Sequence, residues 1–424
     1  MLRSSNILLI FKTKFRDIKT IFRDIKTIFR DITCFNGSGN ASIQSSSKIF
    51  EYDHAMYQDG LGSRFSRFVY SSLHEAPILE SLRLKLDRKS GALDIGLWVR
   101  TAVKRSVREL DIDMPFIFAP VILPWSLYTG GCKTLVTWKL SNMTLVDAFS
   151  LPASFPFLKE LSLVHMKYPS EEFVNEFLSN CPVLEDLAVE QCSDDNVTGL
   201  SVKIPSLKNL SLRKSTDIDE DKTCGYVVDA PSLESFEVLD HSGEFCVIEN
   251  NMPEIVYAYL DINYSHPWKI LRSISSAKQL ELCLASSKEY PVGTVFHNLV
   301  YLMLCTCEPE WLNLLLFLLR DSPKLRFLRF EQYHPIRPSE QRLWWSEPSS
   351  VPECILSSLE ILEWVKYEGI EEEKEIVAFI LGNARLLNKA TISSTSTDPV
   401  KKLEMLKELS FLSRCSSTCH LTFD

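Results

Sequence analysis

The stretch Leu158-Lys-Glu-Leu161-Ser-Leu163 contains the pattern that decides the fold of this chain, with apolar residues at its first, fourth and sixth positions. The same spacing returns in twelve further copies, whose first apolar residues are Leu79, Val107, Leu135, Leu184, Leu207, Leu233, Ile255, Ala277, Leu299, Leu325, Leu359 and Leu387. The copies follow one another at nearly regular intervals, and those led by Val107, Ile255 and Ala277 are the weakest. Thirteen copies in register predict a repeat array rather than one compact core.

Each copy predicts a short strand, because its last two apolar residues alternate with residues that face the other side. Before some strands a helix is expected, as at Phe173, Val174, Phe177 and Leu178 and over the apolar run Trp311 to Leu319. Repeats of this pattern and spacing are leucine-rich repeats. The predicted fold class is therefore α/β, a leucine-rich-repeat solenoid (horseshoe) with a parallel sheet on its concave side. The shortest repeats, such as those beginning at Leu184 and Ile255, leave little room for a helix, so the convex side should be uneven.

Composition and charge agree with a folded protein that does not bind nucleic acid. Hydrophobic residues make up 45% of the 424 residues and charged residues 24%. The chain has 46 Lys and Arg and 55 Asp and Glu. Residues 1–33 contain eight of the basic and three of the acidic residues, so the remainder carries a net charge of about -14. A surface of that sign repels phosphate backbones, which argues against sequence-independent nucleic-acid binding.

No export signal or membrane anchor is expected. The early apolar run Ile7 to Phe11 is too short for a signal-peptide core, and Leu312 to Leu319 is too short for a membrane span. The twelve cysteines are scattered and lack the dense spacing of disulfide scaffolds, which indicates reduced thiols packed in a core. We therefore expect a cytoplasmic or nuclear protein without membrane contact.

A distinct segment begins where the interval between copies is longest, between Leu325 and Leu359. Its marked residues are Trp345, Pro348, Val351, Pro352, Glu353, Cys354, Trp364, Tyr367, Gly369, Asn383 and Ala384. The prolines enforce a turn, Leu359 to Trp364 forms a strand, and Gly369 lets the chain reverse. Glu371 to Glu373 suit the positive start of a following helix.

Two helices and a strand are expected to complete this segment as a cap on the solenoid. Ile376, Val377, Ile380 and Leu381 give the first helix one apolar face, and Leu403, Leu406, Leu409 and Leu412 do the same for the second. Leu421 to Phe423 is expected to form the last strand.

This C-terminal segment closely resembles the FBD domain of plant F-box proteins. Tyr57 to Gly60 and Arg64 to Val69 also resemble the residues that lead into the repeats of the F-box/FBD/LRR-repeat family. The resemblance implies a substrate-recognition subunit of an SCF-type E3 ubiquitin ligase. In such a subunit an N-terminal F-box binds a Skp-type linker, and through it a cullin, while the repeats hold a protein target.

The first residues depart from the family. We therefore divide the chain into three parts: an atypical segment without an F-box (1–48), the leucine-rich repeats (49–342) and the FBD domain (343–424). In place of an F-box, Phe15 to Ile21 is copied at Phe22 to Ile28 and begun again at Phe29. The apolar spacing predicts an amphipathic partner or membrane helix. The alternative, which we favour, is a duplication without function or a misplaced reading-frame start, because three heptads are the lower limit for a coiled coil.

The function expected is therefore protein-protein interaction as a substrate-recognition subunit, with an unknown protein target and with Skp-type linker and cullin only if an F-box is present. The alternatives are an LRR–FBD interaction protein or truncated relative that joins no ligase, and a small-ligand receptor with a pocket in the loops above the sheet. Charged residues at outward strand positions are the candidates for the concave binding face. The alternative interpretation is that each of them is a solvated surface residue without a role in binding. They are Arg83, Lys85, Lys139, Arg213, Glu237, Arg329 and Glu331.

Enzymatic activity, a cofactor and a metal site are not expected. Two motifs could supply metal ligands, Cys305-x-Cys307 and Cys415-x-x-x-Cys419-His420. Neither has a second pair at zinc-finger spacing to complete four ligands. Gly130-Gly-Cys-Lys-Thr134 lacks the adjacent Gly-Lys of a phosphate loop. Cys192 and Cys307 occupy the position eight residues after the first apolar one, where we expect them to pack and to form weak hydrogen bonds inside the turn.

Overall fold

The computed structural model describes residues 49–56, 63–76, 78–88, 90–115, 121–129, 133–146, 154–191, 196–197, 199–214, 225–242, 246–264, 266–284, 293–334 and 345–423. The strands and α-helices named below all lie in one compact unit, Ser46–His54 with Asp59–Asp424. Among the helices described, none combines the length and apolar character needed to cross a membrane.

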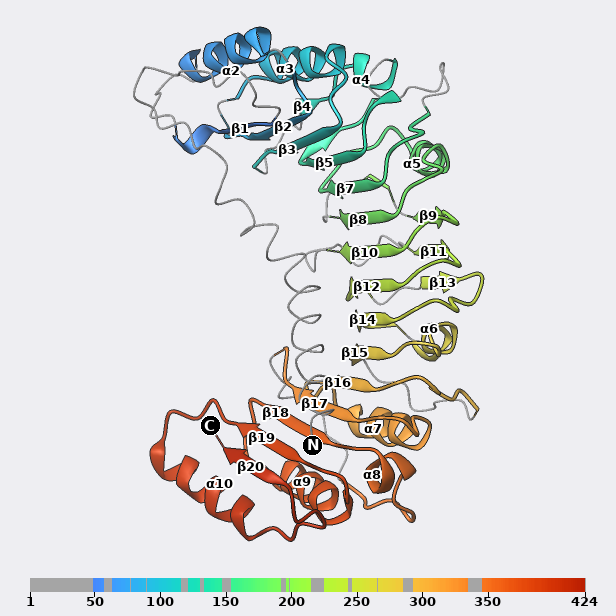
Figure 1. Cartoon of the computed structure of the whole chain (residues 1–424), viewed down its shortest axis with the longest axis vertical. Helices are drawn as coiled ribbons and strands as arrows, with labels where there is room; N and C mark the ends of the chain where they lie inside the picture. Colours follow the sequence, from blue (N-terminus) through green and yellow to red (C-terminus); the bar gives the residue numbers. More distant parts are fainter. Residues whose placement is uncertain are drawn as a thin grey trace. The chain divides into compact units, whose positions relative to one another are not determined.

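One parallel sheet of fifteen strands runs through this unit, and its strands follow one another in chain order (Figure 1). They are β1 (Ile49–Asp53), β2 (Ser81–Lys85), β3 (Glu109–Asp113), β5 (Thr137–Ser141), β7 (Glu160–Val164), β8 (Asp186–Gln191), β10 (Asn209–Lys214), β12 (Ser235–Asp240), β14 (Tyr257–Ile262), β15 (Gln279–Leu284), β16 (Tyr301–Cys305), β17 (Phe327–Glu331), β18 (Ile361–Val365), β19 (Lys389–Ser393) and β20 (His420–Phe423). Each of the thirteen repeat copies supplies one strand, from β2 to β19, and β20 is the predicted last strand. The leucine-rich-repeat solenoid is thereby confirmed.

The core follows directly from the apolar spacing. Leu161 and Leu163 of β7 are each 1% exposed and lie opposite Leu187 and Val189 of β8, so the two inward positions of every repeat stack on those of the next. The weak copies obey the same register: in the copy led by Ala277, Leu280 and Leu282 are fully buried. A repeat therefore needs its neighbours to cover its apolar side chains.

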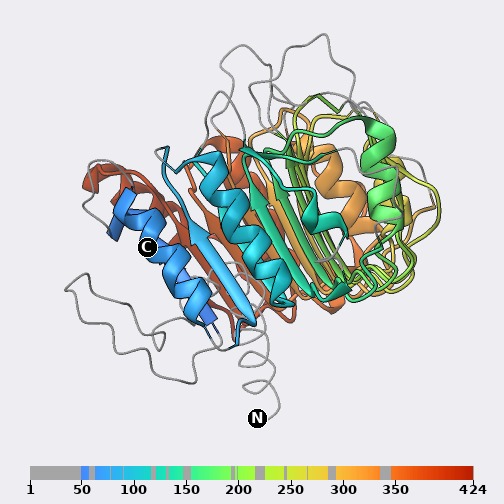
Figure 2. The same cartoon turned by 90° about the horizontal axis from the view of Figure 1, so that it is seen from above.

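The second layer, behind the sheet, is uneven as expected (Figure 2). Its helices are α2 (Ser63–Glu75), α3 (Ala92–Lys104), α4 (Ser126–Thr129), α5 (Glu171–Ser179), α6 (Trp268–Ser273), α7 (Trp311–Arg320), α8 (Glu353–Ser357), α9 (Glu371–Asn383) and α10 (Pro399–Phe411). In the chain, the one-turn helix η1 (His54–Met56) follows β1. Other repeats carry short parallel strands instead: β4 (Val121–Ile122) with β6 (Met143–Thr144), and β9 (Leu200–Lys203), β11 (Tyr226–Asp229) and β13 (Cys246–Ile248). Among the shortest repeats, those beginning at Leu184 and Leu233 hold such a strand, and the one beginning at Ile255 holds the short helix α6.

The helix-forming residues are buried where the sequence predicted, with one exception. Phe173, Val174, Phe177 and Leu178 are the buried residues of α5. The N-cap Ser170 accepts a hydrogen bond from the Phe173 N–H at 3.2 Å, which satisfies one free donor of the first turn. In α9 the predicted apolar face, Ile376, Val377, Ile380 and Leu381, is buried.

The predicted apolar face of α10 is the exception. Only Leu409 of this stripe is buried, while Leu403 and Leu406 are 50% and 43% exposed and Leu412 is the C-cap. The leucine spacing predicts which residues share a helix face, but burial depends on what packs against that face. Leu403 and Leu406 are only about half covered by the described residues.

Several predictions fall on residues outside the described part: the heptad copies and missing F-box in 1–48, Tyr57 to Gly60, Cys192, and Gly130 to Cys132. The predicted domain limits stay predictions. At the proposed limit near residue 343 the main sheet is continuous, because β17 pairs with β18 from Phe327↔Ile361 to Glu331↔Val365.

Candidate functional site

The residues between the buried positions form the outer face of the main sheet, the face opposite the second layer. The register aligns one such side chain from every strand into a middle row. From β1 to β20 this row reads Glu51, Arg83, Asp111, Lys139, Ser162, Ala188, Ser211, Glu237, Tyr259, Glu281, Met303, Arg329, Glu363, Thr391 and Thr422. Residues two positions before and after form parallel rows on the same face.

In the first strands the outer face is a ladder of ion pairs between neighbouring repeats. Lys139 Nζ lies 2.6 Å from Glu160 Oε1, Arg83 Nη2 lies 3.6 Å from Glu109 Oε2, and Lys85 pairs with Asp53 at 3.7 Å. Each pair is partly exposed, so it contributes about 0–1 kcal/mol. The predicted cations of this half thus have partners within the chain.

The other candidate charges lie further along the same face. Arg213 Nη2 is 3.5 Å from Glu237 Oε2, and Arg329 lies between Glu331 at 2.5 Å and Glu363 at 3.1 Å. All seven predicted residues therefore point to one face, although they extend over many repeats and do not converge on one point. Their part in binding stays a prediction.

Between β14 and β17 the outer face carries five aromatic side chains, a feature that the search for charged positions missed. Its members, the aromatic surface, are Tyr257, Tyr259, Tyr301, Phe327 and Tyr333. The rings of Tyr301 and Phe327 are 4.8 Å apart, and those of Tyr259 and Tyr333 are 6.4 Å apart. Burial raises the pKa of all four tyrosines, so their hydroxyls stay protonated at neutral pH. Four of these residues stand two or four positions after the first apolar residue of their repeats, and this regular placement is the sequence signal for them.

Carboxylates surround the aromatic surface: Glu237, Asp261, Glu281, Glu331 and Glu363. Arg329 is the cation between two of them. Negative charge also contributes to the raised pKa of Tyr257 and Tyr333, after burial. This part of the face therefore presents apolar rings within a mostly negative field.

A His–Asp–His group lies beside the aromatic surface. Asp261, 3% exposed, lies 2.6 Å from His241 Nε2 through Oδ1 and 3.0 Å from His334 Nε2 through Oδ2. Burial raises the pKa of the Asp261 carboxyl, but the hydrogen bond and charge of His241 and the charge of His334 outweigh it, so the net pKa is lowered. The hydrogen bond to Asp261 raises the pKa of His241 despite partial burial.

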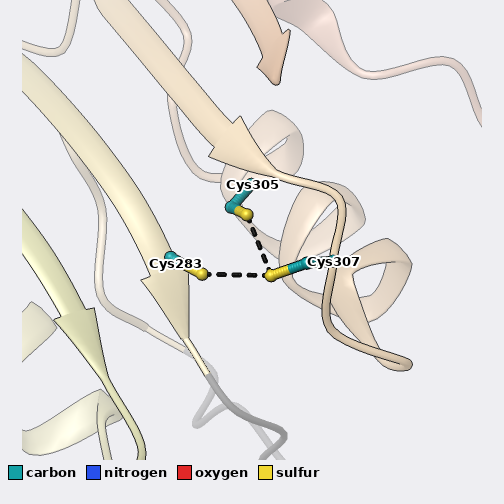
Figure 3. A group of neighbouring side chains, drawn as sticks. All are labelled: Cys283, Cys305 and Cys307. Carbon is teal, nitrogen blue, oxygen red and sulfur yellow. Dashed lines mark hydrogen bonds between the residues drawn. The ribbon is translucent and has the colours of Figure 1, made fainter. Parts of the chain in front are cut away.

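Three buried cysteines lie next to this group, from two consecutive repeats (Figure 3). The Sγ atoms of Cys283 and Cys307 are 3.3 Å apart, and those of Cys305 and Cys307 are 3.0 Å apart. The Tyr333 N–H donates to Cys305 Sγ at 3.3 Å. Hydrogen bonds with the Cys283 and Cys307 thiols and the one from this N–H lower the pKa of Cys305, although burial opposes the shift. Cys307 is buried and hydrogen-bonded as expected, but one of its partners, Cys283, belongs to the preceding repeat.

The FBD-like residues mostly build the interior of the C-terminal cap. Trp364 is 1% exposed, and its ring contacts those of Phe330 at 4.5 Å, Tyr367 at 5.6 Å and Trp311 at 6.1 Å. Trp311 Nε1 donates to Glu372 Oε1 at 3.2 Å, which joins α7 to α9.

The remaining motif residues fix turns and helix ends. Gly369 has φ +71°, and Glu373 Oε2 accepts from its N–H at 2.8 Å. Cys354 Sγ donates to Leu319 O at 3.0 Å, and Ala384 is the C-cap of α9. The Trp345 and Phe379 rings are 5.5 Å apart, and Asn383 Nδ2 donates to Phe379 O. Pro352 precedes Glu353 as the N-cap of α8, after the half-buried Val351.

The motif also lines a surface pocket of about 400 Å³, between Pro348 and Pro352 on one side and α7 on the other. Asn313, Phe317 and Arg320 supply the α7 side of this pocket.

A parallel sheet with one strand per repeat, layered behind by helices or short strands, defines a leucine-rich-repeat protein. The family model of the leucine-rich repeats of the FBD-associated F-box protein At5g56370 matches residues 95–258, and the FBD model matches residues 347–392. The chain is similar to the probable FBD-associated F-box protein At1g32375 of Arabidopsis thaliana, with 53% identity over 380 residues covering 88% of this chain and 89% of that protein. The chain belongs to the FBD-associated F-box protein family.

Two further known proteins are similar to the chain. The F-box/FBD/LRR-repeat protein At5g56420 of Arabidopsis thaliana is 44% identical over 379 residues, covering 88% of each chain. A chain from the crystal structure of the Rad7 and Elc1 complex in yeast has 16% identity and a TM-score of 0.35, covering 66% of this chain and 71% of that one. A likeness of that degree is too weak to indicate a shared function. The family names suggest a role in protein interaction, of the F-box adaptor type, rather than in catalysis.

Proposed function

We propose that this chain is a protein-binding adaptor that recognises its target with the outer face of strands β12 to β18. The observation that carries this proposal is the aromatic surface of Tyr257, Tyr259, Tyr301, Phe327 and Tyr333, set among carboxylates. Large aromatic side chains are the residues that most often dominate the binding energy of protein interfaces. Membership of the family supports the same role.

The chemistry of this face favours a target segment that carries Lys or Arg beside an apolar or aromatic residue. Glu237, Glu331 and Glu363 would attract the cations, and the exposed parts of the rings would cover the apolar side chain. Arg329 is held between two of these carboxylates, so the local balance stays negative.

We further propose that the adaptor serves an SCF-type E3 ubiquitin ligase in the cytoplasm or nucleus, through a Skp-type linker and cullin. The relatives' names, which contain F-box, support this part. The eight described cysteines are free thiols, which suits a reducing compartment. The alternative is an interaction protein that joins no ligase, which the departure of residues 1–48 from the F-box pattern favours.

A pull-down of purified Skp-type linker by the full chain separates the two. Retention at micromolar concentration supports the ligase role. No retention would remove the ligase role while leaving target binding intact.

Target binding is tested with two matched substitutions on the same face. Proteins retained by the full chain are identified, and their affinities are compared for the wild type, Tyr259→Ala and the exposed control Glu51→Ala at the far end of the sheet. We expect Tyr259→Ala to weaken binding about tenfold or more, which corresponds to about 1.4 kcal/mol. Equal affinities for the three proteins would refute the assignment of the face.

A further inference from the structure

The three-cysteine cluster is a feature that target recognition does not explain. Cys283 lies near the end of β15, Cys305 is the last residue of β16, and Cys307 follows in the next turn. Leu282 pairs with Leu304, so the register carries Cys283 and Cys305 side by side on the outer face. Their three Sγ atoms lie within 4.8 Å of one another, and each residue is less than a tenth exposed.

We propose that Cys283, Cys305 and Cys307 bind one zinc ion as three thiolate ligands. Zinc binds cysteine sulfur at about 2.3 Å and takes four ligands in a tetrahedron. Three of these come from this cluster. The fourth position is filled by water, as it is in zinc sites with three protein ligands.

The contacts between these sulfur atoms are thiol hydrogen bonds, and they are close. The Cys305–Cys307 and Cys283–Cys307 sulfur separations of 3.0 and 3.3 Å are shorter than the roughly 3.5–4.0 Å between non-bonded carbon atoms, although sulfur is the larger atom. They also exceed the roughly 2.05 Å of a disulfide bond, and all three cysteines are free. Three cysteine sulfurs gathered in one place are soft ligands of the kind that zinc prefers. A tetrahedral zinc ion with bonds of about 2.3 Å would hold them about 3.8 Å apart, so zinc binding would move these sulfur atoms apart by less than about 1 Å.

The surroundings of the cluster suit a bound thiolate. The Tyr333 N–H points at Cys305 Sγ at 3.3 Å, and amide-to-sulfur hydrogen bonds of this kind orient metal ligands and spread their charge. Tyr333 also packs against the three cysteines. Because the ligands come from two repeats, zinc would link β15, β16 and the turn after β16 in addition to the hydrogen bonds of the sheet.

The test is zinc binding by the full chain, purified under reducing conditions, stripped with a chelator and titrated with zinc alone. We expect one zinc per chain, and X-ray absorption should show about three sulfur ligands at about 2.3 Å. Cobalt(II) in place of zinc should give sulfur-to-metal charge-transfer absorption. Zinc-free protein after titration, or a zinc ion with nitrogen and oxygen ligands, would overturn the proposal.

Matched cysteine variants locate the site. Cys307→Ser should lower zinc affinity by at least a hundredfold, whereas Cys354→Ser, which removes a buried thiol outside the cluster, should leave it unchanged. Cys415→Ser tests the exposed C-terminal cysteine in the same way. If Cys307→Ser fails to fold, Cys283→Ser takes its place and the sulfur count in the wild type decides. Binding that survives the cluster variants, or is lost with Cys415→Ser, would refute the site.

Discussion

Replacing Trp364 by alanine should loosen the C-terminal cap far more than the rest of the chain. The side chain is 1% exposed and touches the rings of Phe330, Tyr367 and Trp311 at 4.5 to 6.1 Å. Buried Trp→Ala substitutions cost about 3–5 kcal/mol, and aromatic pairs add about 0.5–1.5 kcal/mol each. We therefore expect a loss at the upper end of the first range, about 4–5 kcal/mol.

The loss should be local, because each repeat contacts only its neighbours. Amide hydrogen exchange measures this strand by strand. Protection in β18 and β19 should fall by about three orders of magnitude, since about 1.4 kcal/mol is tenfold, while protection in β7 and β8 should stay near the wild-type level.

Two controls make the measurement specific. Trp364→Phe keeps part of the ring contact and should give an intermediate loss. Phe411→Ala removes a large apolar side chain that is 87% exposed and should change protection little. A fall of less than tenfold in β18 for Trp364→Ala, or an equal fall in β7, would refute the packing argument.

Three further predictions address a helix start, a histidine pair and the middle of the sheet. Glu373→Ala removes the acceptor of two N–H groups before α9 and should cost about 1 kcal/mol in chemical unfolding, against little change for the exposed Glu371→Ala. Burial raises the pKa of Glu373 to about 7, above the value in the unfolded chain. The wild type should therefore lose stability relative to Glu373→Gln as pH rises from about 4.5 to about 7. A difference in unfolding free energy between the two proteins that stays constant with pH would contradict this. The pKa of His241 is raised by Asp261, so this pair stabilises the fold below about pH 6.5 and its contribution is lost as pH rises through the folded pKa. The free energy of unfolding lost in His241→Gln should therefore be largest near pH 6 and shrink toward about pH 9. It should not exceed about 1 kcal/mol, because the ring is partly exposed. Leu302→Ala, at a fully buried position of β16, should cost about 2–5 kcal/mol by denaturant unfolding, and a cost below about 1 kcal/mol would show that the repeat core is not close-packed there.

The strands were predictable from the sequence because burial depends on spacing that a single repeat already contains. Even Val107 and Ala277, which lead weak copies, precede strands with two buried inward residues. The stripe of α10 shows the limit of this reasoning. Spacing defines which residues share a helix face, but the cover for that face comes from elsewhere in the fold, and Leu403 lacks it in the described structure.

The candidate site was harder to predict, because it is made between repeats. Cys305 and Cys307 stood out as a pair, whereas their partner Cys283 belongs to the preceding repeat. The signal was nevertheless present, since Cys283 and Cys305 each come six residues after the first apolar residue of their repeats. Comparing equal positions of neighbouring repeats would have placed the third sulfur, and the tyrosines, on one face. The side-chain distances needed the structure.

Because side chains alternate along each strand, the inward residues determine folding and the outward residues determine what the surface can contact. In β14, Leu260 is fully buried and holds its repeat to the next, while its neighbour Tyr259 points to the outer face. A substitution at an outer position can therefore change what one repeat touches at little cost to folding, as long as it avoids paired groups. A lineage of such proteins can acquire new recognition one repeat at a time, while the inward positions preserve the same scaffold.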